Sequence, residues 1–237
     1  MAENKRIILK LSGEALGNGG QLFDYGAFQA AAKKLMAVQA LGFELAVVIG
    51  GGNVWRGRRG EARAMGAVAA DQMGMLATMQ NAIMMHDSLT SLGAKSTVMS
   101  AVDILRFAQP FQAAKAKELL SQGHILLLGG GTGNPFFSTD SAVALRALEL
   151  DCGQILMAKC VDGVYDKDPD EYADAQMIPD ISYEDCLKRA LRAIDLTAMI
   201  LLRDNDFPKV RAFKLDKAGD NLLKVLSGDP MGTTLHP

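Results

Sequence analysis

Two glycine triplets, each placed at the end of an apolar run, restrict the folds that this chain can adopt. One run leads into glycines 50–52 and the other into glycines 129–131. A buried strand that ends in glycine brings bare backbone N–H groups to the carboxyl edge of a sheet, where no Cβ keeps an anion away. A third apolar run over 7–11 supplies the cation of Lys10. We therefore predict three strand ends that converge on a phosphate-bearing ligand, although tight strand-to-helix turns alone would also explain the glycines.

Segments with helical spacing alternate with these runs, which predicts an α/β fold. Helices long enough to cross back over a parallel sheet separate most of the strands. The predicted helices span 27–41, 67–92, 112–122, 139–150 and 183–204. The predicted strands span 7–11, 43–49, 94–99, 124–128, 154–158, 210–213 and 222–226, with a turn-rich loop over 161–169. We expect Asp24 to cap the first helix and Gly42 to end it.

Length and charge limit the class of protein. A chain of 237 residues with 49% apolar content can bury one sizeable core, so we expect a single domain over 1–237. A net charge of −2, with acids and bases mixed, gives no basic face for nucleic acid and no polybasic membrane anchor. The polar start and the lack of an apolar run of about 18 residues predict neither a signal peptide nor a membrane span. We therefore expect a cytoplasmic protein with a small ligand.

The residue types that usually build metal centres or nucleophilic sites show no suitable spacing. Cys152, Cys160 and Cys186 are odd in number and lack a Cys-x-x-Cys pair, so we interpret them as packing residues. The three histidines give neither a triad order nor a metal-ligand spacing. The Walker pattern is absent, and the segment 129–133 lacks the last glycine of a dinucleotide fingerprint. P-loop, metal-hydrolase and dinucleotide oxidoreductase functions are therefore poorly supported.

Five sequence blocks carry a family resemblance. They are Lys10-Leu11-Ser12-Gly13-Glu14, Gly50-Gly51-Gly52-Asn53 with Arg56-Gly57, Asp71-x-Met73-Gly74-Met75-Leu76-Ala77-Thr78, the run from Gly131 to Asp140, and Val161-Asp162-Gly163-Val164-Tyr165 with Asp168-Pro169. Together they resemble the bacterial uridylate kinases, a branch of the amino acid kinase fold. The resemblance covers nearly the whole chain and extends to Asp195-Leu196-Thr197-Ala198 and the Gly232-Thr233 pair.

The resemblance implies a three-layer α/β/α sandwich with a mostly parallel central sheet. It also implies transfer of the γ-phosphoryl group of ATP to UMP, which gives UDP and ADP in de novo pyrimidine nucleotide (CTP) biosynthesis. Mg²⁺ would accompany ATP without a metal site built from side chains, because this ion keeps most of its waters and borrows phosphate oxygens. We further expect a homohexamer with GTP as activator and UTP as inhibitor. The N-terminal part would mainly bind UMP and the C-terminal part ATP.

Roles for individual residues also follow from the resemblance. Lys10, Arg56 and Asp140 would be catalytic, with Lys10 at the transferring phosphoryl group and Arg56 as a forked donor to phosphate. The expected ATP-binding residues are Lys10, Leu11, Ser12, Gly13, Gly52, Arg56, Lys159, Tyr165 and Asp168. The expected UMP-binding residues are Gly51, Asp71, Thr132, Gly133, Asn134, Pro135, Phe136, Phe137, Ser138 and Thr139.

Some of these assignments have a structural alternative. Asp71 and Asp140 lie near predicted helix starts, where a carboxylate can simply cap the helix or meet its dipole. In its functional interpretation, Asp140 orients Lys10 or a water bound to Mg²⁺. Lys159 stands where the resembled family carries Thr or Asn, so it would either swing toward the phosphates or cover the adenine. The methionines of the predicted helix over 67–92 would lie in the core or in a subunit interface.

Two other functions remain open at the level of sequence. One is a different enzyme of the amino acid kinase fold that phosphorylates a carboxylate or a carbamate. The block that begins at Asp71 and the Phe136-Phe137 pair argue against it. The other is a non-catalytic nucleotide sensor. The altered Lys159-Cys160 pair favours a sensor, whereas the presence of Lys10, Arg56 and Asp140 argues for an enzyme.

Overall fold

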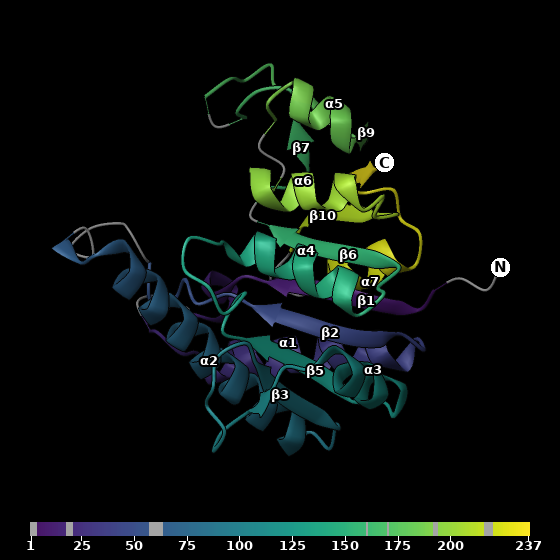
Figure 1. Ribbon diagram of the computed structural model, residues 1–237. Helices are drawn as coiled ribbons and strands as arrows, with labels where there is room; N and C mark the ends of the chain where they lie inside the picture. Colours follow the sequence, from purple (N-terminus) through teal and green to yellow (C-terminus); the bar gives the residue numbers. More distant parts are fainter. Residues whose placement is uncertain are drawn as a thin grey trace.

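A nine-stranded, mostly parallel sheet runs through the computed structural model (Figure 1). The structure describes residues 4–17, 21–56, 64–159, 161–169, 171–191, 194–215 and 220–237. The strands of the sheet are β1 (Arg6–Leu11), β2 (Glu44–Ile49), β3 (Ser96–Ser100), β4 (Gln109–Pro110), β5 (Ile125–Gly129), β6 (Gln154–Lys159), β9 (Asp180–Ser182), β10 (Val210–Lys214) and β11 (Thr233–His236). Their order is β4-β3-β5-β2-β1-β6-β10-β11-β9, and among the described strand pairs of this sheet only β10 and β11 are antiparallel.

Helices and one small ribbon complete the described structure. The helices are η1 (Gly13–Leu16), α1 (Tyr25–Ala40), α2 (Ala67–Ser91), α3 (Ala113–Ser121), α4 (Thr139–Glu149), α5 (Tyr183–Lys188), α6 (Leu196–Asp204) and α7 (Asp220–Leu226). The ribbon pairs β7 (Val164–Tyr165) with β8 (Met177–Ile178) in antiparallel fashion. Asp24 caps α1 by accepting from the Ala27 N–H at 3.1 Å, and Gly42 follows the helix with a φ of 86°, as predicted.

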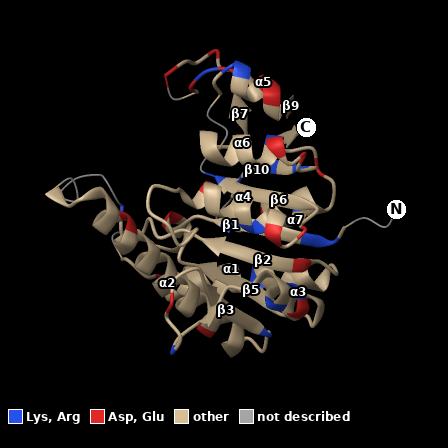
Figure 2. Cartoon of the chain, in the orientation of Figure 1, with Lys and Arg blue, Asp and Glu red and all other residues tan. Residues whose placement is uncertain are grey.

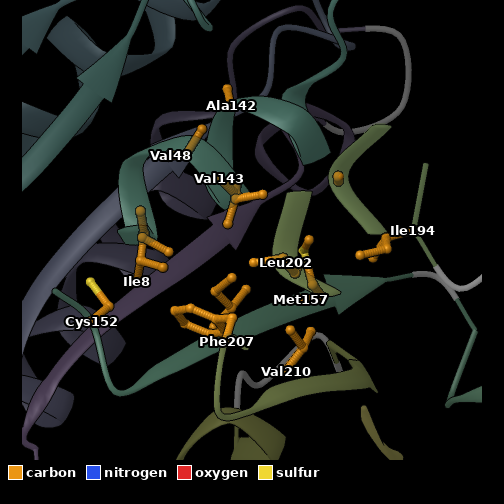
Figure 3. Packing of buried hydrophobic residues seen from close by; sticks show 14 of the residues in the cluster. Ile8, Val48, Ala142, Val143, Cys152, Met157, Ile194, Leu202, Phe207 and Val210 are labelled. Atoms are coloured by element: carbon orange, nitrogen blue, oxygen red, sulfur yellow. The ribbon is translucent and has the colours of Figure 1, made fainter. Parts of the chain in front are cut away.

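The sheet has a helical layer on each face because successive strand residues point in opposite directions. Ile8 of β1 faces a core shared with α3, α4, α5 and α6. Its neighbours Ile7 and Leu9 face a second core shared with α1, α2 and α7. Figure 3 shows the first core, in which strand residues such as Ile8 pack with helix residues such as Val143 and Leu202. The expected three-layer α/β/α sandwich is therefore confirmed.

The long helix α2 contributes both buried and exposed residues. Its N-terminal end extends beyond the sheet in Figure 1, while Met79 and Met85 lie in the core. Met73, by contrast, is 42% exposed. Packing therefore explains some of the methionines of this helix and leaves others on its outer face.

Two expectations for the C-terminal third were wrong. The predicted helix over 183–204 is divided into α5 and α6, and Ala190, just after α5, has a left-handed φ of 51° that ends the helical path. The segment 222–226 belongs to helix α7 rather than to a strand, because Leu222 and Val225 both reach the core at a spacing of one helical turn.

The described cysteines pack in the core, and the charged residues are spread over the elements of the chain. Cys152 and Cys186 are buried in the first core, and burial raises the pKa of Cys152 to about 12. Cys160 lies outside the described residues. Acidic and basic residues are interspersed along the elements of the chain, as the coloured cartoon in Figure 2 shows. Among the described helices, none has the length and apolar character needed to cross a membrane.

Candidate active site

The carboxyl ends of four adjacent parallel strands line one edge of the sheet. In the register of β5, β2, β1 and β6, Leu128 lies beside Val48, Val48 beside Lys10, and Lys10 beside Met157. Both glycine loops, the start of η1 and Lys159 at the end of β6 therefore meet at this edge. The strand ends converge as the sequence predicts.

Gly13 brings the start of η1 against the first glycine loop. A Cβ at this position would lie 2.6 Å from the Gly50 carbonyl oxygen and 2.8 Å from the Gly52 nitrogen, so only glycine fits. Ser12, which follows Leu11 at the end of β1, caps η1 by accepting from the Glu14 N–H. The start of η1, which follows the strand that carries Lys10, therefore packs against the backbone of the first glycine loop.

Lys10 and Asp140 form an ion pair at this edge. The Nζ atom of Lys10 lies 2.8 Å from Oδ1 of Asp140, and the two side chains are 20% and 14% exposed. Asp140 lies in the first turn of α4, but Ser138 caps this helix, because its hydroxyl accepts from the N–H groups of Asp140 and Ser141. The capping alternative for Asp140 is therefore wrong, and its carboxylate is available to orient Lys10.

Lys159 joins this pair in a charged cluster. Burial alone would raise the pKa of Asp140, but the ammonium groups of Lys10 and Lys159 together hold it below its usual value. Burial lowers the pKa of Lys159, against the opposing effect of the Asp140 carboxylate. One carboxylate thus pairs with the Lys10 ammonium group and interacts electrostatically with that of Lys159, an arrangement suited to an anionic ligand.

Asp71 reaches the loop between β5 and α4. Its Oδ2 atom accepts from the Phe136 N–H at 2.7 Å, whereas Gly66 occupies the N-cap of α2. Phe136 has a left-handed φ of 72°, a conformation that costs a non-glycine residue about 1–3 kcal/mol and persists only where its surroundings enforce it. Phe136 and Phe137 are 66% and 51% exposed. Asp71 therefore tethers a strained turn whose aromatic rings face outward.

The same loop is shaped by its own polar groups. Thr132 Oγ1 lies 3.2 Å from both the backbone nitrogen and the carbonyl oxygen of Asn134. The Gly133 N–H donates to the Gly130 carbonyl at 2.9 Å. Pro135 continues the loop, and Thr139 begins α4 directly after Ser138. The expected UMP-binding residues of this loop thus form one compact turn at the carboxyl end of β5.

Arg56 lies beside η1. Its Nη2 atom is 3.5 Å from Oε1 of Glu14, and its side chain is 65% exposed. The structure therefore places an exposed guanidinium next to the first glycine loop. Gly57, which follows it in the sequence block, lies outside the described residues.

Tyr165 lies in the small β7 and β8 ribbon. Its hydroxyl donates to Oδ1 of Asp162 at 2.6 Å, and this hydrogen bond raises the pKa of Tyr165. Asp168 follows in the turn after β7, where its carbonyl accepts from two backbone N–H groups. These two expected ATP-side residues thus lie on a separate element from the charged cluster.

Thr233 of β11 attaches this ribbon to the large sheet. Its side chain is fully buried. Its hydroxyl accepts from the Val164 N–H at 2.8 Å and donates to the Ile178 carbonyl at 2.6 Å, so it contacts both strands of the ribbon. The position of Tyr165, next to Val164 in the chain, therefore depends on a residue near the C-terminus.

Comparison with known protein families decides the family. The model of the amino acid kinase family matches residues 5–211. The chain belongs to the amino acid kinase family. This member of the family is similar to a solved UMP kinase from Bacillus anthracis, with 32% identity, 98% of this chain and 96% of that chain covered, and a TM-score of 0.90.

Two further solved structures resemble this amino acid kinase family member. A UMP kinase from Ureaplasma parvum has 30% identity and a TM-score of 0.91, with 99% of each chain covered. A uridylate kinase from Archaeoglobus fulgidus has 24% identity and a TM-score of 0.72, with 97% of this chain and 99% of that chain covered, which shows a shared fold.

Asp195, to which the sequence analysis gave no role, hydrogen-bonds to the start of the helix that carries Asp140. In this amino acid kinase family member it caps α6 by accepting from the Ala198 N–H at 2.8 Å. Its carboxylate also accepts from the Ser141 N–H at 3.1 Å and from the Ser138 hydroxyl. Asp195 thereby joins the start of α6 to the start of α4, where Asp140 lies. An aspartate before an apolar run is a helix-start signal, but the predicted helix over 183–204 concealed it.

Proposed function

We propose that this protein transfers the γ-phosphoryl group of ATP to UMP and releases UDP and ADP. The observation that carries the proposal is the Lys10 and Asp140 pair at the junction of two glycine loops. A lysine held by a carboxylate beside bare backbone amides is suited to phosphate chemistry. Similarity over almost the full length to two UMP kinases supports UMP as the acceptor.

The chemistry requires positioning and charge neutralisation more than proton transfer. The attacking group is a phosphate oxygen of UMP, which is largely ionised near neutral pH because the second phosphate pKa is about 6. Two negatively charged phosphates must approach in line, so cations and N–H groups at the reacting centre lower the barrier. We assign Lys10 to the transferring phosphoryl group, Arg56 to a phosphate as forked donor, and Asp140 to orientation of Lys10.

Nucleotide contacts divide between the two glycine loops and the C-terminal ribbon. We assign ATP to Leu11, Ser12, Gly13, Gly52, Lys159, Tyr165 and Asp168 together with Lys10 and Arg56. We assign UMP to Gly51, Asp71 and the loop from Thr132 to Thr139. The arrangement of these residues supports this division, since the loop tethered by Asp71 lies at the end of β5 and the ribbon follows β6. UMP then lies mainly on the N-terminal part and ATP mainly on the C-terminal part.

The residues present fit Mg²⁺ bound through ATP. The described residues contain no group of three or more His, Cys, Asp or Glu side chains that could hold a metal ion by themselves. Mg²⁺ prefers phosphate oxygens and water with one or two carboxylates, and we assign Asp140, the carboxylate paired with Lys10, to orientation of such a water. When bound, the ion neutralises charge on the phosphates of ATP.

We extend the proposal to a homo-oligomer, a hexamer, with GTP as activator and UTP as inhibitor. Exposed apolar residues on the outer face of α2 support self-association, since Met73, Leu76 and Ile83 are 42%, 48% and 42% exposed. The regulators follow from the uridylate kinase resemblance.

A panel of acceptors tests the proposed function. Purified protein with ATP and Mg²⁺ is given UMP, CMP, AMP or GMP, and ADP release is measured. We expect strong turnover with UMP alone. Folded protein, established by circular dichroism, that releases no ADP with any acceptor would contradict the proposal and favour a nucleotide sensor. Trapping of an acyl phosphate with hydroxylamine after addition of carboxylates would favour the alternative kinase.

The pH dependence of kcat reports on Lys159. Burial lowers the pKa of this lysine. As pH rises, its ammonium group therefore loses its proton at a lower pH than an ordinary lysine, whose pKa is about 10.4. We expect kcat to fall on the alkaline side through this pKa. Lys159→Arg keeps its charge and should remove the alkaline decline. An unchanged profile in Lys159→Arg would contradict the role of Lys159 at the phosphates.

Thr233→Val should weaken ATP binding through the ribbon. Valine keeps the shape but removes both hydrogen bonds, so we expect the free energy of unfolding to fall by about 1–3 kcal/mol. The KM for ATP should rise while the KM for UMP stays constant. Thr234→Val, a neighbouring change that removes an acceptor for Arg211 instead, is the matched control. An equal rise in the KM for ATP in both variants would contradict this account.

A further inference from the structure

One turn of α2, residues 77–81, packs against both glycine loops. A Cβ on Gly51 would lie 2.8 Å from the Cβ of Ala77, and a Cβ on Gly129 would lie 2.4 Å from Sδ of Met79. Glycine at position 51 therefore allows the backbone of the helix to come close to the first loop, and glycine at position 129 leaves room for the Met79 side chain. The two loops therefore pack against residues of the same helical turn, Ala77 and Met79.

Thr78 fastens the second glycine loop to this turn. Its side chain is 7% exposed, and its Oγ1 atom accepts from the Gly130 N–H at 2.8 Å. The same hydroxyl donates its single proton to the Met75 carbonyl at 2.7 Å. Because the proton is committed to the helix, the lone pairs of the oxygen face the loop and hold the Gly130 amide.

Asn81 fastens the first glycine loop to the same turn. Its side chain is fully buried, and its Nδ2 atom donates at 2.7 Å to both the Gly50 carbonyl and Oδ1 of Asn53. The Nδ2 atom of Asn53 donates back to Oδ1 of Asn81 at 3.1 Å and to the Leu22 carbonyl at 2.6 Å. This pattern needs a donor and an acceptor in one side chain, which an amide supplies.

We propose that Thr78 and Asn81 are positioning residues that set the separation of the two phosphate-binding loops. The inference rests on the proposed function, in which the first loop serves both nucleotides and the second loop serves UMP. The two residues are three apart and so lie on one face of α2. A rigid helix between the loops fixes how closely the two phosphates approach, and a misplacement of about 1 Å costs about 100-fold in rate.

Thr78→Val tests this tether, because valine has the shape of threonine without the hydroxyl. We expect kcat to fall by about tenfold or more, while the KM values for ATP and UMP stay within about threefold of wild type. Thr78→Ser keeps the hydroxyl and should restore kcat to about half of wild type or better. Met85→Ala, a change at a fully buried core position of the same helix, should lower the melting temperature yet keep kcat within about twofold.

Amide hydrogen exchange provides a readout that does not depend on turnover. The peptide that contains Gly130 should exchange faster in Thr78→Val than in wild type, in Thr78→Ser or in Met85→Ala. If the Thr78→Val protein does not fold, the same measurements are made on Thr78→Ala, which lacks the same hydroxyl.

The outcomes separate this inference from the proposed function. A wild-type protein that does not phosphorylate UMP overturns the proposed function and the inference with it. An active wild type with unchanged kcat in Thr78→Val overturns the inference alone. Equal losses of kcat in Thr78→Val and Met85→Ala also overturn it, because activity would then follow stability rather than loop position.

Discussion

Lys10→Ala should lower kcat for UMP phosphorylation by about 100-fold or more and leave the Kd of UMP within about threefold of wild type. Lys10 lies at the point where β1, the first glycine loop and the start of α4 meet, and its ammonium group is 2.8 Å from Asp140. Its positive charge stabilises the transition state most, when the phosphoryl group is being transferred. The loss should therefore fall on kcat rather than on acceptor binding.

Lys34→Ala is the matched control for this substitution. Lys34 also forms an ion pair, with Asp220 at 2.5 Å, but it lies on α1 and pairs with α7 on the face opposite to α4. We expect its kcat to equal that of wild type. We expect the Lys10→Ala protein to fold, because Lys159 still neutralises part of the Asp140 charge. Melting curves check that it does. An unchanged kcat in folded Lys10→Ala would remove the central assignment of the site.

Asp140→Asn should also lower kcat by about 100-fold. The amide has the shape of the carboxylate but no charge, so it can neither form the ion pair with Lys10 nor stabilise the ammonium form of Lys159. The Asp140 carboxylate opposes the lowering of the Lys159 pKa by burial. Without this carboxylate, the pKa of Lys159 should therefore fall further. The alkaline decline of kcat should accordingly move to lower pH in Asp140→Asn.

The double variant distinguishes a shared role from two separate ones. If Asp140 acts through Lys10, Lys10→Ala with Asp140→Asn should be little slower than Lys10→Ala alone. Asp220→Asn, which removes an exposed ion-paired carboxylate, controls for the change of charge. Effects of Lys10→Ala and Asp140→Asn that multiply would contradict the positioning role of Asp140.

The central sheet was predictable because its signals are local. The strands β1, β2, β5 and β6 each carry an apolar run, and Gly42 and Asp24 mark helix ends directly in the sequence. In the C-terminal third the strand predicted over 210–213 is confirmed as β10, whereas β11 and α7 were not predicted, because pairing partners rather than residue pattern decide these elements. β11 has four residues and lies between β10 and β9, and the helix α7 has the apolar run of a short strand.

The site was predictable where a residue follows a strand and less so where two distant elements meet. Lys10 and the glycine loops could be placed at one edge because parallel strands end together. Thr78 and Asp195 could not, because their contacts depend on how α2 and α6 lie against the loops after folding. The resemblance included both positions in its sequence blocks, but a block does not say what a side chain touches.

Transfer of label from ATP tests the central claim most directly. Protein, Mg²⁺, UMP and ATP labelled with ³²P at the γ position are incubated, and the nucleotides are separated. We predict that label appears in UDP, at its β phosphorus, at the rate at which ADP is formed. Label that stays in ATP, or that appears only as inorganic phosphate while the protein remains folded, would contradict the assignment of this site to UMP phosphorylation.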